Sequence, residues 1–327
     1  MIINNKNKIN AAVIILAARK NIFKKTLSLF YKNWNYKYDY PVHVHTFGKI
    51  FSDNEIKQYN SEISKNIYFH IIHPQIPAHI NQKELFFNRT YIPYVKKYFP
   101  KSRIGYLHMC YFASNITAYG KQGCVVKEIS KYDYLMRIDD ESWFKKKINF
   151  DLFKILKNYS MATGALDYYK NPKGTRENLL EFYYSYIKKK KIIPKNKILK
   201  KGFINNKKNV FDKLKWSAGN FDLYNLKKIN TPKWKSFIDS INKYGGQYKH
   251  RWADFEIFSL YVMTYFKKGI YNFNFEKNGI YSPNFQNSAE TIYSDSIINI
   301  HNNSFIYLIY KSILKIKNYL LSKVRLL

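Results

Sequence analysis

The chain has 327 residues, of which 46% are hydrophobic, and 56 Lys and Arg stand against 22 Asp and Glu, giving a formal net charge of +34. This share of apolar residues excludes wholesale disorder, and the length allows one large α/β domain or two modest ones. The basic residues are spread along the chain together with Asn, Ile, Tyr and Phe, all of which have A/T-rich codons. We therefore attribute most of the charge to codon composition and expect no nucleic acid partner.

The first half of the chain alternates strands and helices. Ala11–Ala18 is a short apolar run typical of a buried parallel strand, and Arg19 lies at its exit. Ile22–Trp34 has the spacing of an amphipathic helix. Pro41–Phe47 and Asn66–Ile72 are predicted strands. This order favours a doubly wound α/β fold.

The remaining segments continue this pattern. The predicted helices are Lys83–Tyr98, Gly105–Asn115, Pro232–Tyr244 and Trp252–Phe266, and the predicted strands are Tyr132–Asp139, Met161–Leu166 and Ile270–Phe275. Trp216–Tyr224 is expected to form a turn that leads into a strand. We expect a single α/β domain over residues 8–303, with a mostly parallel, Rossmann-like central sheet flanked by helices. Residues 8–145 and residues 146–303 would form the two halves of this domain.

Two basic segments stand apart. Residues 186–209 are rich in lysine and are expected to form a solvated loop or a short excursion, with binding to an anionic lipid or acceptor as the alternative. Residues 304–327 have the pattern of a basic amphipathic helix, which either packs on the domain or lies in a membrane surface.

Several kinds of segment are not expected. No apolar run is long enough for a transmembrane anchor, and no small-residue cleavage site follows Ala11–Ala18, so a cytoplasmic or peripheral membrane location is favoured. Cys110 and Cys124 match no zinc spacing and imply no disulfide framework, although a single bridge between them stays open. The pairs His43/His45 and His70/His73 are interpreted as core or edge histidines and not as metal ligands.

Three acidic positions are candidates for chemistry. The strand Tyr132–Asp139 ends in Asp139, Asp140 and Glu141, at the sheet edge where α/β proteins bind ligands. Such carboxylates suit Mg²⁺ or Mn²⁺ on a nucleotide diphosphate, although a solvated acidic turn is the simpler interpretation.

Asp222 follows a tight segment near the expected edge of a pocket. Asp254 follows the break at Gly245-Gly246 and lies near a helix start, where an acid also suits the helix dipole.

Taken in order, four segments resemble the fungal-type α-1,2-mannosyltransferases of glycosyltransferase family 15. Gly105–Ser114 (GYLHMCYFAS) is similar to the family's Y-R-H-M-C-R-F-x-S helix, and Tyr132–Asp140 (YDYLMRIDD) to its Y-x-Y-Y-W-R-V-E-P strand. Asn220–Leu223 (NFDL) is similar to N-F-E-I, and Gly245–Asp254 (GGQYKHRWAD) to G-G-F-x-Y-E-R-W-G-D.

The resemblance implies a GT-A fold, a GDP-mannose donor, Mn²⁺ (or Mg²⁺) as the cofactor and retention of the anomeric configuration. It assigns the metal-binding carboxylate to Asp139, the candidate nucleophile to Asp222 and a second catalytic acid to Asp254. It also assigns Tyr106 to the donor sugar and Arg19 to the nucleotide. The expected partners are a nucleotide-sugar donor, a glycan, glycoprotein or glycolipid acceptor, and a membrane surface for residues 304–327.

The chain also departs from the family pattern. Asp139 and Asp222 stand where the family has Glu, and Leu107 and Tyr111 replace two arginines. Ser282 falls where the family has a late metal-binding His. Two alternatives therefore stay open: transfer from a different nucleotide sugar, and a non-catalytic basic module that binds anionic membrane or nucleic acid.

Overall fold

The structure is a computed structural model that describes residues 9–86, 103–117, 127–167, 176–207 and 209–282. Contacts divide the chain into two compact units, Met1–Pro283 and Asn284–Leu327. The second unit lies outside the described residues. The predicted domain end at residue 303 and the predicted helix 304–327 therefore stay predictions.

A seven-stranded sheet forms the centre of the first unit, in the order β10-β6-β9-β4-β1-β2-β3. Its strands are β1 (Ala11–Leu16), β2 (Val42–Phe47), β3 (Ile67–Ile72), β4 (Tyr134–Asp139), β6 (Met161–Thr163), β9 (Phe221–Asn225) and β10 (Ile270–Asn272). Within it, β9 runs antiparallel to its neighbours β4 and β6, and the other pairs are parallel. The predicted α/β class with a mostly parallel sheet is confirmed.

Two small antiparallel ribbons lie outside this sheet. One joins β5 (Trp143–Phe144) to β11 (Tyr281–Ser282), and the other joins β7 (Leu166–Asp167) to β8 (Trp216–Ser217). The predicted strand Met161–Leu166 is therefore wrong in its extent, because the chain leaves the central sheet after Thr163 and pairs again in a separate ribbon.

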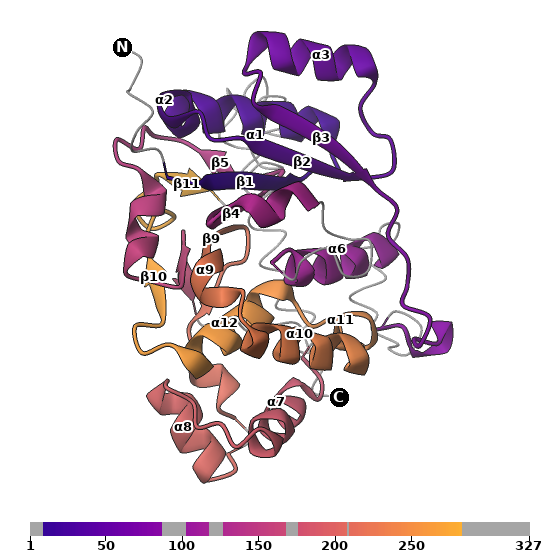
Figure 1. Cartoon of the computed structure of the whole chain (residues 1–327), viewed down its shortest axis with the longest axis vertical. Coiled ribbons are helices and arrows are strands. Elements are labelled where there is room, and N and C mark those ends of the chain that lie inside the picture. Colours follow the sequence, from indigo (N-terminus) through magenta and orange to yellow (C-terminus); the bar gives the residue numbers. More distant parts are fainter. Residues whose placement is uncertain (1–8, 87–102, 118–126, 168–175, 208, 283–327) are drawn as a thin grey trace, which may run out of the picture. The chain divides into compact units, whose positions relative to one another are not determined.

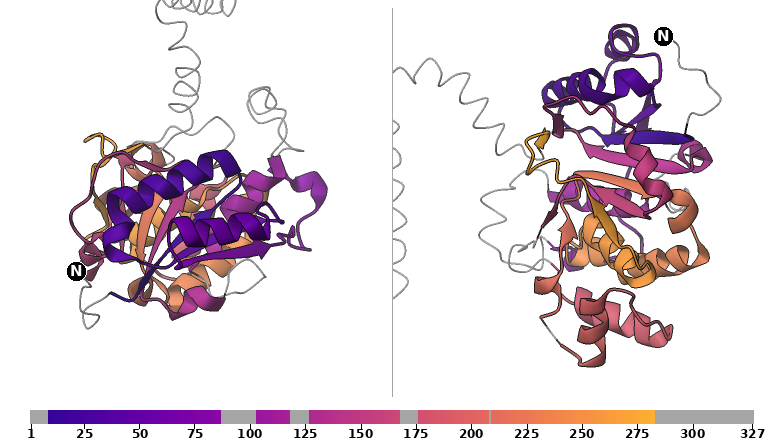
Figure 2. Two further views of the ribbon diagram at one scale, coloured as in Figure 1. Left: turned by 90° about the horizontal axis from the view of Figure 1, so that it is seen from above. Right: turned by 90° about the vertical axis from the view of Figure 1, so that its left-hand side faces the viewer.

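Helices cover both faces of the sheet (Figure 1). One side carries α1 (Lys20–Phe30), α2 (Tyr36–Tyr38) and α3 (Asp53–Glu62). The other side carries α6 (Arg103–Asn115), α10 (Pro232–Tyr244), α11 (Gly246–Lys249) and α12 (Asp254–Tyr265). The remaining described α-helices are α7 (Leu179–Lys189), α8 (Lys197–Ile204) and α9 (Leu226–Ile229). Figure 2 shows the same layers from two further sides.

Alternation along the strands divides the core in two. Val13 and Ile15 of β1 belong to a buried cluster with Phe23 of α1, whereas Ala12 and Ile14 belong to a second cluster with residues of α6 and α12. Because helices cover both faces, every position of this central strand can be apolar.

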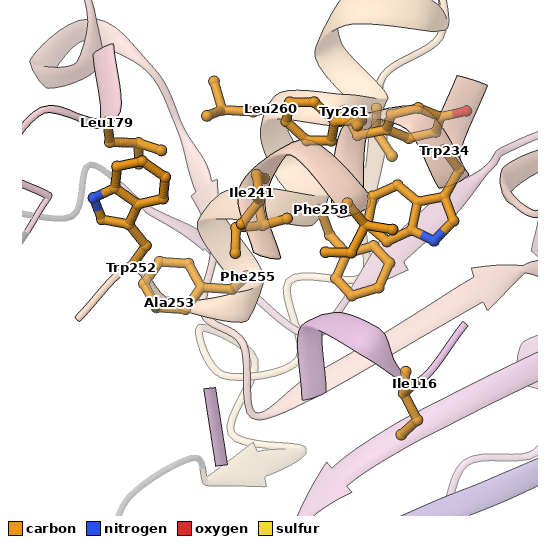
Figure 3. Packing of buried hydrophobic residues seen from close by; sticks show 14 of the residues in the cluster. Ile116, Leu179, Trp234, Ile241, Trp252, Ala253, Phe255, Phe258, Leu260 and Tyr261 are labelled. Carbon is orange, nitrogen blue, oxygen red and sulfur yellow. The ribbon is translucent and has the colours of Figure 1, made fainter. Parts of the chain in front are cut away.

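Large aromatic rings fill the second cluster where α10 meets α12 (Figure 3). The Trp234 ring stacks on Phe258 with centroids 4.6 Å apart and meets the edge of Tyr261 at 4.8 Å. This packing fixes α12, whose first residue is Asp254.

Three helix predictions need correction. The predicted helix Ile22–Trp34 begins earlier, as α1, and continues as a π-helical segment over Tyr31–Asn35. The predicted helix Lys83–Tyr98 opens with a 3-10 turn, Gln82–Glu84, and lies outside the described residues beyond Phe86. Helix α3 was not predicted, although Ser52 and Glu55 form a capping box at its start.

The basic stretch 186–209 is not simply a solvated loop. It contains the end of α7 and the whole of α8. The physical reason is local: the Asn196 side chain accepts hydrogen bonds from the backbone N–H groups of Ile198 and Leu199, and Leu199 is buried.

Candidate active site

Three chain segments meet at one edge of the sheet. Strand β4 ends at Asp139, opposite Leu16 at the end of β1. Strand β9 runs the other way, so it begins at this edge, and the backbone N–H of Asp139 donates to the carbonyl of Asn220 at 3.1 Å. The carboxyl ends of the parallel strands and the start of β9 therefore surround the same region, as expected for a ligand site in such a sheet.

A buried arginine organises the carboxylates at this edge. Arg137 and Asp139 are alternate residues of β4 and point to the same face. The Arg137 guanidinium contacts Asp139 Oδ1 through Nη2 and Asp254 Oδ2 through Nη1, each at 2.8 Å. It also donates to the carbonyl of Gly219. The side chain of Arg137 is 4% exposed, so these partners replace water around its charge.

The carboxyl of Asp222 lies one strand away. Asp222 is opposite Arg137 in the β4–β9 register and is fully buried. Its carboxyl accepts hydrogen bonds from the Ser217 and Tyr224 hydroxyls. Burial raises the pKa of Asp222, while the hydroxyl donors and the Arg137 charge oppose that rise.

Asp254 is the first residue of α12. Burial raises the pKa of Asp254 to about 7, against the lowering effect of the Arg137 charge. Glu256, two residues later, accepts a hydrogen bond from the backbone N–H of Ala253 at 3.0 Å and pairs with Arg176. This cap, together with the Arg137 contact, fixes the start of α12 beside the end of β4.

Helix α6 packs over the cluster on the side of the sheet that also carries α10, α11 and α12. Met109 Sδ lies 3.6 Å from Arg137 Nη2. One turn earlier on α6, the Tyr106 ring lies under the Arg251 guanidinium, whose Cζ is 4.3 Å from the centroid of the ring. Arg251 has a φ of 55°, a left-handed conformation that is uncommon for a residue with a side chain and that occurs more often at functional sites.

The three successive acids after β4 have different partners. Asp140 is 2% exposed and accepts hydrogen bonds from the backbone N–H groups of Ala18 and Arg19, at 2.8 and 3.0 Å. The Arg19 guanidinium pairs with Asp140 and, at 2.8 Å, with Glu141. Asp139 alone faces Arg137, and its side chain keeps 30% exposure. Asp139 is therefore the acid of this run that is left accessible to a ligand.

Few of the described protein groups at this edge of the sheet could bind a divalent cation. The described residues contain no group of three or more His, Cys, Asp or Glu side chains that could hold a metal. Asp139 offers hard carboxylate oxygens, the type that Mn²⁺ and Mg²⁺ prefer, and such ions are commonly held by one or two carboxylates plus substrate phosphates. Ser282 is buried in β11, opposite Trp143. The residues present fit a cation that arrives with a diphosphate.

The histidines of β2 and β3 form a separate cluster. His43 Nδ1 lies 2.9 Å from His70 Nε2, and the two rings stack with centroids 5.1 Å apart. His45 stacks on His70 and meets Phe112 at a tilted angle. Burial lowers the pKa of His43 to about 3 and lowers that of His70, so these rings are packed as neutral groups.

The structure thus brings the predicted residues Asp139 and Asp254 together around Arg137, with Asp222 in the next strand. Tyr106 lies beneath a different arginine, Arg251. Arg19 lies beside this group through Asp140. Arg137 was missed as a functional residue. Its signal in the sequence is its position two residues before Asp139 on a buried strand, where a cation needs buried partners.

The sequence profile of the glycolipid 2-alpha-mannosyltransferase family matches residues 1–320. The chain belongs to this family. A Saccharomyces cerevisiae member named "Probable mannosyltransferase KTR3" is 25% identical over 209 residues, which cover 62% of this chain and 48% of the yeast protein. The yeast glycolipid 2-alpha-mannosyltransferase is 22% identical over 271 residues, or 81% of this chain and 59% of that protein. The chain thus matches only about half the length of these two members.

Solved structures of similar proteins share the fold. Core-mannan synthase A from Aspergillus fumigatus, in its Mn/GDP form, superposes with a TM-score of 0.65 at 18% identity, over 83% of this chain and 74% of that one. The mannosyltransferase Ktr4p from S. cerevisiae, in complex with GDP, superposes with a TM-score of 0.63 at 19% identity, over 80% and 68%. These likenesses support the GT-A-type fold. Within the described residues, every helix is too short or too polar to span a bilayer.

Proposed function

We propose that this chain is a retaining hexosyltransferase that transfers mannose from GDP-mannose to the hydroxyl of a glycan, glycoprotein or glycolipid acceptor. The observation that carries the proposal is the pairing of Arg137 with both Asp139 and Asp254 at the carboxyl edge of the sheet. Family membership supports the reaction class, and the similar structures with bound GDP support the donor base.

The roles of the residues follow from their exposure and charge. Asp139 is the partly exposed carboxylate and would hold the cation, whose chemistry is to neutralise the diphosphate as it leaves. Arg137 and Asp254 form a buried pair that would support the site by holding Asp139 in place. Tyr106 and Arg251 would lie on the donor side, and Arg19 on the nucleotide side.

In this proposal Asp222 does not attack the anomeric carbon directly. Its carboxyl is fully buried and already accepts two hydroxyl donors. A covered carboxylate can stabilise positive charge that develops on the anomeric carbon, because electrostatic effects are strong away from water. We therefore favour charge stabilisation by Asp222 over a covalent intermediate.

A ligand-induced shift in thermal unfolding tests the donor and the cation. GDP-mannose with Mn²⁺ should raise the unfolding temperature, and UDP-glucose should not, because a ligand that binds only the native state stabilises it. The Asp139→Ala protein should stay folded, lose the Mn²⁺-dependent part of the shift and lose transfer activity.

Asp133→Ala is the matched control for that test. It also removes one carboxylate, but Asp133 lies at the opposite end of β4 and pairs with Lys227. The proposal fails if Asp139→Ala keeps full activity or if both variants lose it equally. A shift with UDP-sugars alone would keep the reaction class and change the donor.

We also propose that residues 304–327 form a C-terminal tail that makes peripheral contact with a membrane surface. The same tail packed on the domain is the alternative. Cleavage of the tail from the folded protein, followed by membrane flotation, separates the two.

A further inference from the structure

A dense group of unpaired positive charge lies on α7, α8 and the segments that follow them. Nine exposed lysines occur there, and no Asp or Glu lies between residues 182 and 211. They are Lys188, Lys189, Lys190, Lys191, Lys195, Lys197, Lys200, Lys201 and Lys207. Within the described part of the chain, none of them forms an ion pair, so their charge is available to a partner.

Exposed isoleucines lie among these lysines. Ile193, Ile198 and Ile204 are 62%, 41% and 67% exposed. Eight large hydrophobic side chains are exposed across the described residues, and three of them fall within the twelve positions from Ile193 to Ile204. Single exposed apolar residues are ordinary, but their concentration inside a lysine cluster is typical of a surface that meets both charge and hydrocarbon. We call this set the lysine–isoleucine surface.

The protein holds this surface in a fixed place. The backbone N–H groups of Lys195 and Asn196 donate to the carbonyls of Thr264 and Met263, at 3.0 and 2.9 Å. Gly202 of α8 packs so closely that a Cβ there would collide with the Val210 side chain. The lysines and isoleucines are therefore presented on an ordered support rather than on a loop that must first be ordered.

We propose that the lysine–isoleucine surface docks the protein on an anionic phospholipid membrane. Lysines near such a surface are attracted by its negative potential, and the isoleucines can enter the interfacial region between head groups. A nucleic acid would satisfy the lysines but not the three exposed isoleucines. This inference rests on exposure and charge and does not depend on the proposed sugar transfer.

Helix α12 connects the membrane contact to the candidate active site. It begins with Asp254 and ends close to Met263 and Thr264, which hold the segment before α8. Twelve helical residues span about 18 Å, so the site would stand at roughly that distance from the attachment point. Membrane docking would then favour acceptors that are themselves attached to lipid.

Flotation with lipid vesicles tests the charge. The full chain should bind vesicles of phosphatidylcholine containing about one third phosphatidylserine, and should bind pure phosphatidylcholine far less. Each lysine near the surface contributes roughly a fivefold factor, so removing four should weaken binding on the order of 100-fold or more. The variant combines Lys197→Gln, Lys200→Gln, Lys201→Gln and Lys207→Gln.

The matched control removes the same charge from exposed lysines on the α1 and α3 side: Lys24→Gln, Lys32→Gln, Lys57→Gln and Lys65→Gln. Binding of this control should change little. An equal loss in both variants would assign the effect to overall charge and overturn the proposal. So would undiminished vesicle binding by the first variant, since the contact would then lie elsewhere in the chain.

The isoleucines distinguish a membrane from another polyanion. A variant with Ile193→Ser, Ile198→Ser and Ile204→Ser should lose vesicle binding while it keeps any binding to RNA. These side chains are exposed, so unfolding temperature should not change and serves as the check on folding. Vesicle binding that is unaffected by this variant would show a purely electrostatic contact and would overturn the proposal that the isoleucines enter the membrane.

Discussion

Two arginines near the same sheet edge hold acids in different ways. Arg137 is 4% exposed and joins Asp139 to Asp254, two residues from distant parts of the chain. Arg19 is 42% exposed and pairs with Asp140 and Glu141. Because a charge in the interior cannot fall back on water, the contacts of Arg137 should matter far more to folding than those of Arg19.

The acids at and directly after the end of β4 are adjacent in sequence but have different partners. Asp140 turns toward the end of β1 and holds the β1–α1 connection, whereas Asp139 turns toward Arg137. One acid therefore supports the fold and its neighbour is left for a ligand. The four predictions below test whether burial and the available partners, rather than charge alone, decide these roles.

The largest effect is expected at Arg137. Arg137→Met should lower the free energy of unfolding by about 3–5 kcal/mol, because it leaves two carboxylates beside an apolar side chain. Urea unfolding at neutral pH measures this. The triple variant Arg137→Met/Asp139→Asn/Asp254→Asn should recover much of the loss, since the charges are removed together. A loss below about 1 kcal/mol for Arg137→Met would contradict the buried-cluster description.

A smaller loss is expected at Asp140. Asp140→Ala should cost about 2 kcal/mol, because the backbone N–H groups of Ala18 and Arg19 lose a charged acceptor. The neighbouring Glu141→Ala removes only a partly exposed pair with Arg19 and should cost less than about 1 kcal/mol. Equal losses for the two variants in urea unfolding would show that Asp140 has no special structural role.

His45, in the histidine cluster, tests how burial acts on an ionisable side chain that has no opposite charge beside it in the described part of the chain. Burial and the neighbouring His70 and His43 lower the pKa of His45 well below its usual value, and neither ring nitrogen of His45 has a hydrogen-bond partner among the described residues. Below about pH 6.5 the unfolded chain binds a proton that the folded protein does not. Stability should therefore be complete above that pH and fall as the pH decreases.

The size of this effect is open to direct measurement. His45 alone should account for a loss of about 1.4 kcal/mol between about pH 7.5 and pH 5.5. His45→Phe should remove that part of the pH dependence, and His73→Gln, at an exposed position, should leave it unchanged. If His45→Phe and the parent protein lose stability in parallel over this range, the ring is protonated in the folded state.

The smallest effect is expected at Arg19. Arg19→Gln should lower the free energy of unfolding by about 1 kcal/mol or less, and the difference should shrink as salt is added, because a half-exposed pair is screened. Thermal unfolding at low and high salt measures this. A loss as large as that of Arg137→Met would remove the distinction between the two arginines.

Much of the fold could be predicted because it depends on local pattern. Ala11–Ala18 is apolar at every position, and such a run is typical of a strand covered on both faces. Helix α8 could not be predicted from its composition, because its lysines suggested solvent while its burial depends on Leu199 and Gly202 packing against Val210 and Tyr184.

For the candidate site, the sequence indicated which acids to consider but not how they are arranged. Motif order pointed to Asp139, Asp222 and Asp254. The division between Asp139 and Asp140, however, depends on the backbone N–H groups of Ala18 and Arg19, more than 120 residues away in sequence. The role of Arg137 likewise depends on Asp254, 117 residues later.

The reversed direction of β9 has a consequence for how this family can diversify. The chain leaves the sheet after Thr163 and returns at Phe221. These two points lie at the same edge of the sheet, because Thr163 is paired with Asp222. The two ends of the intervening segment, which carries α7 and α8, are therefore already joined by the ladder between β6 and β9. We expect relatives to lengthen, shorten or exchange the part that carries α7 and α8 without shifting the strand register. Ser217 and Gly219, which contact Asp222 and Arg137, should stay in place.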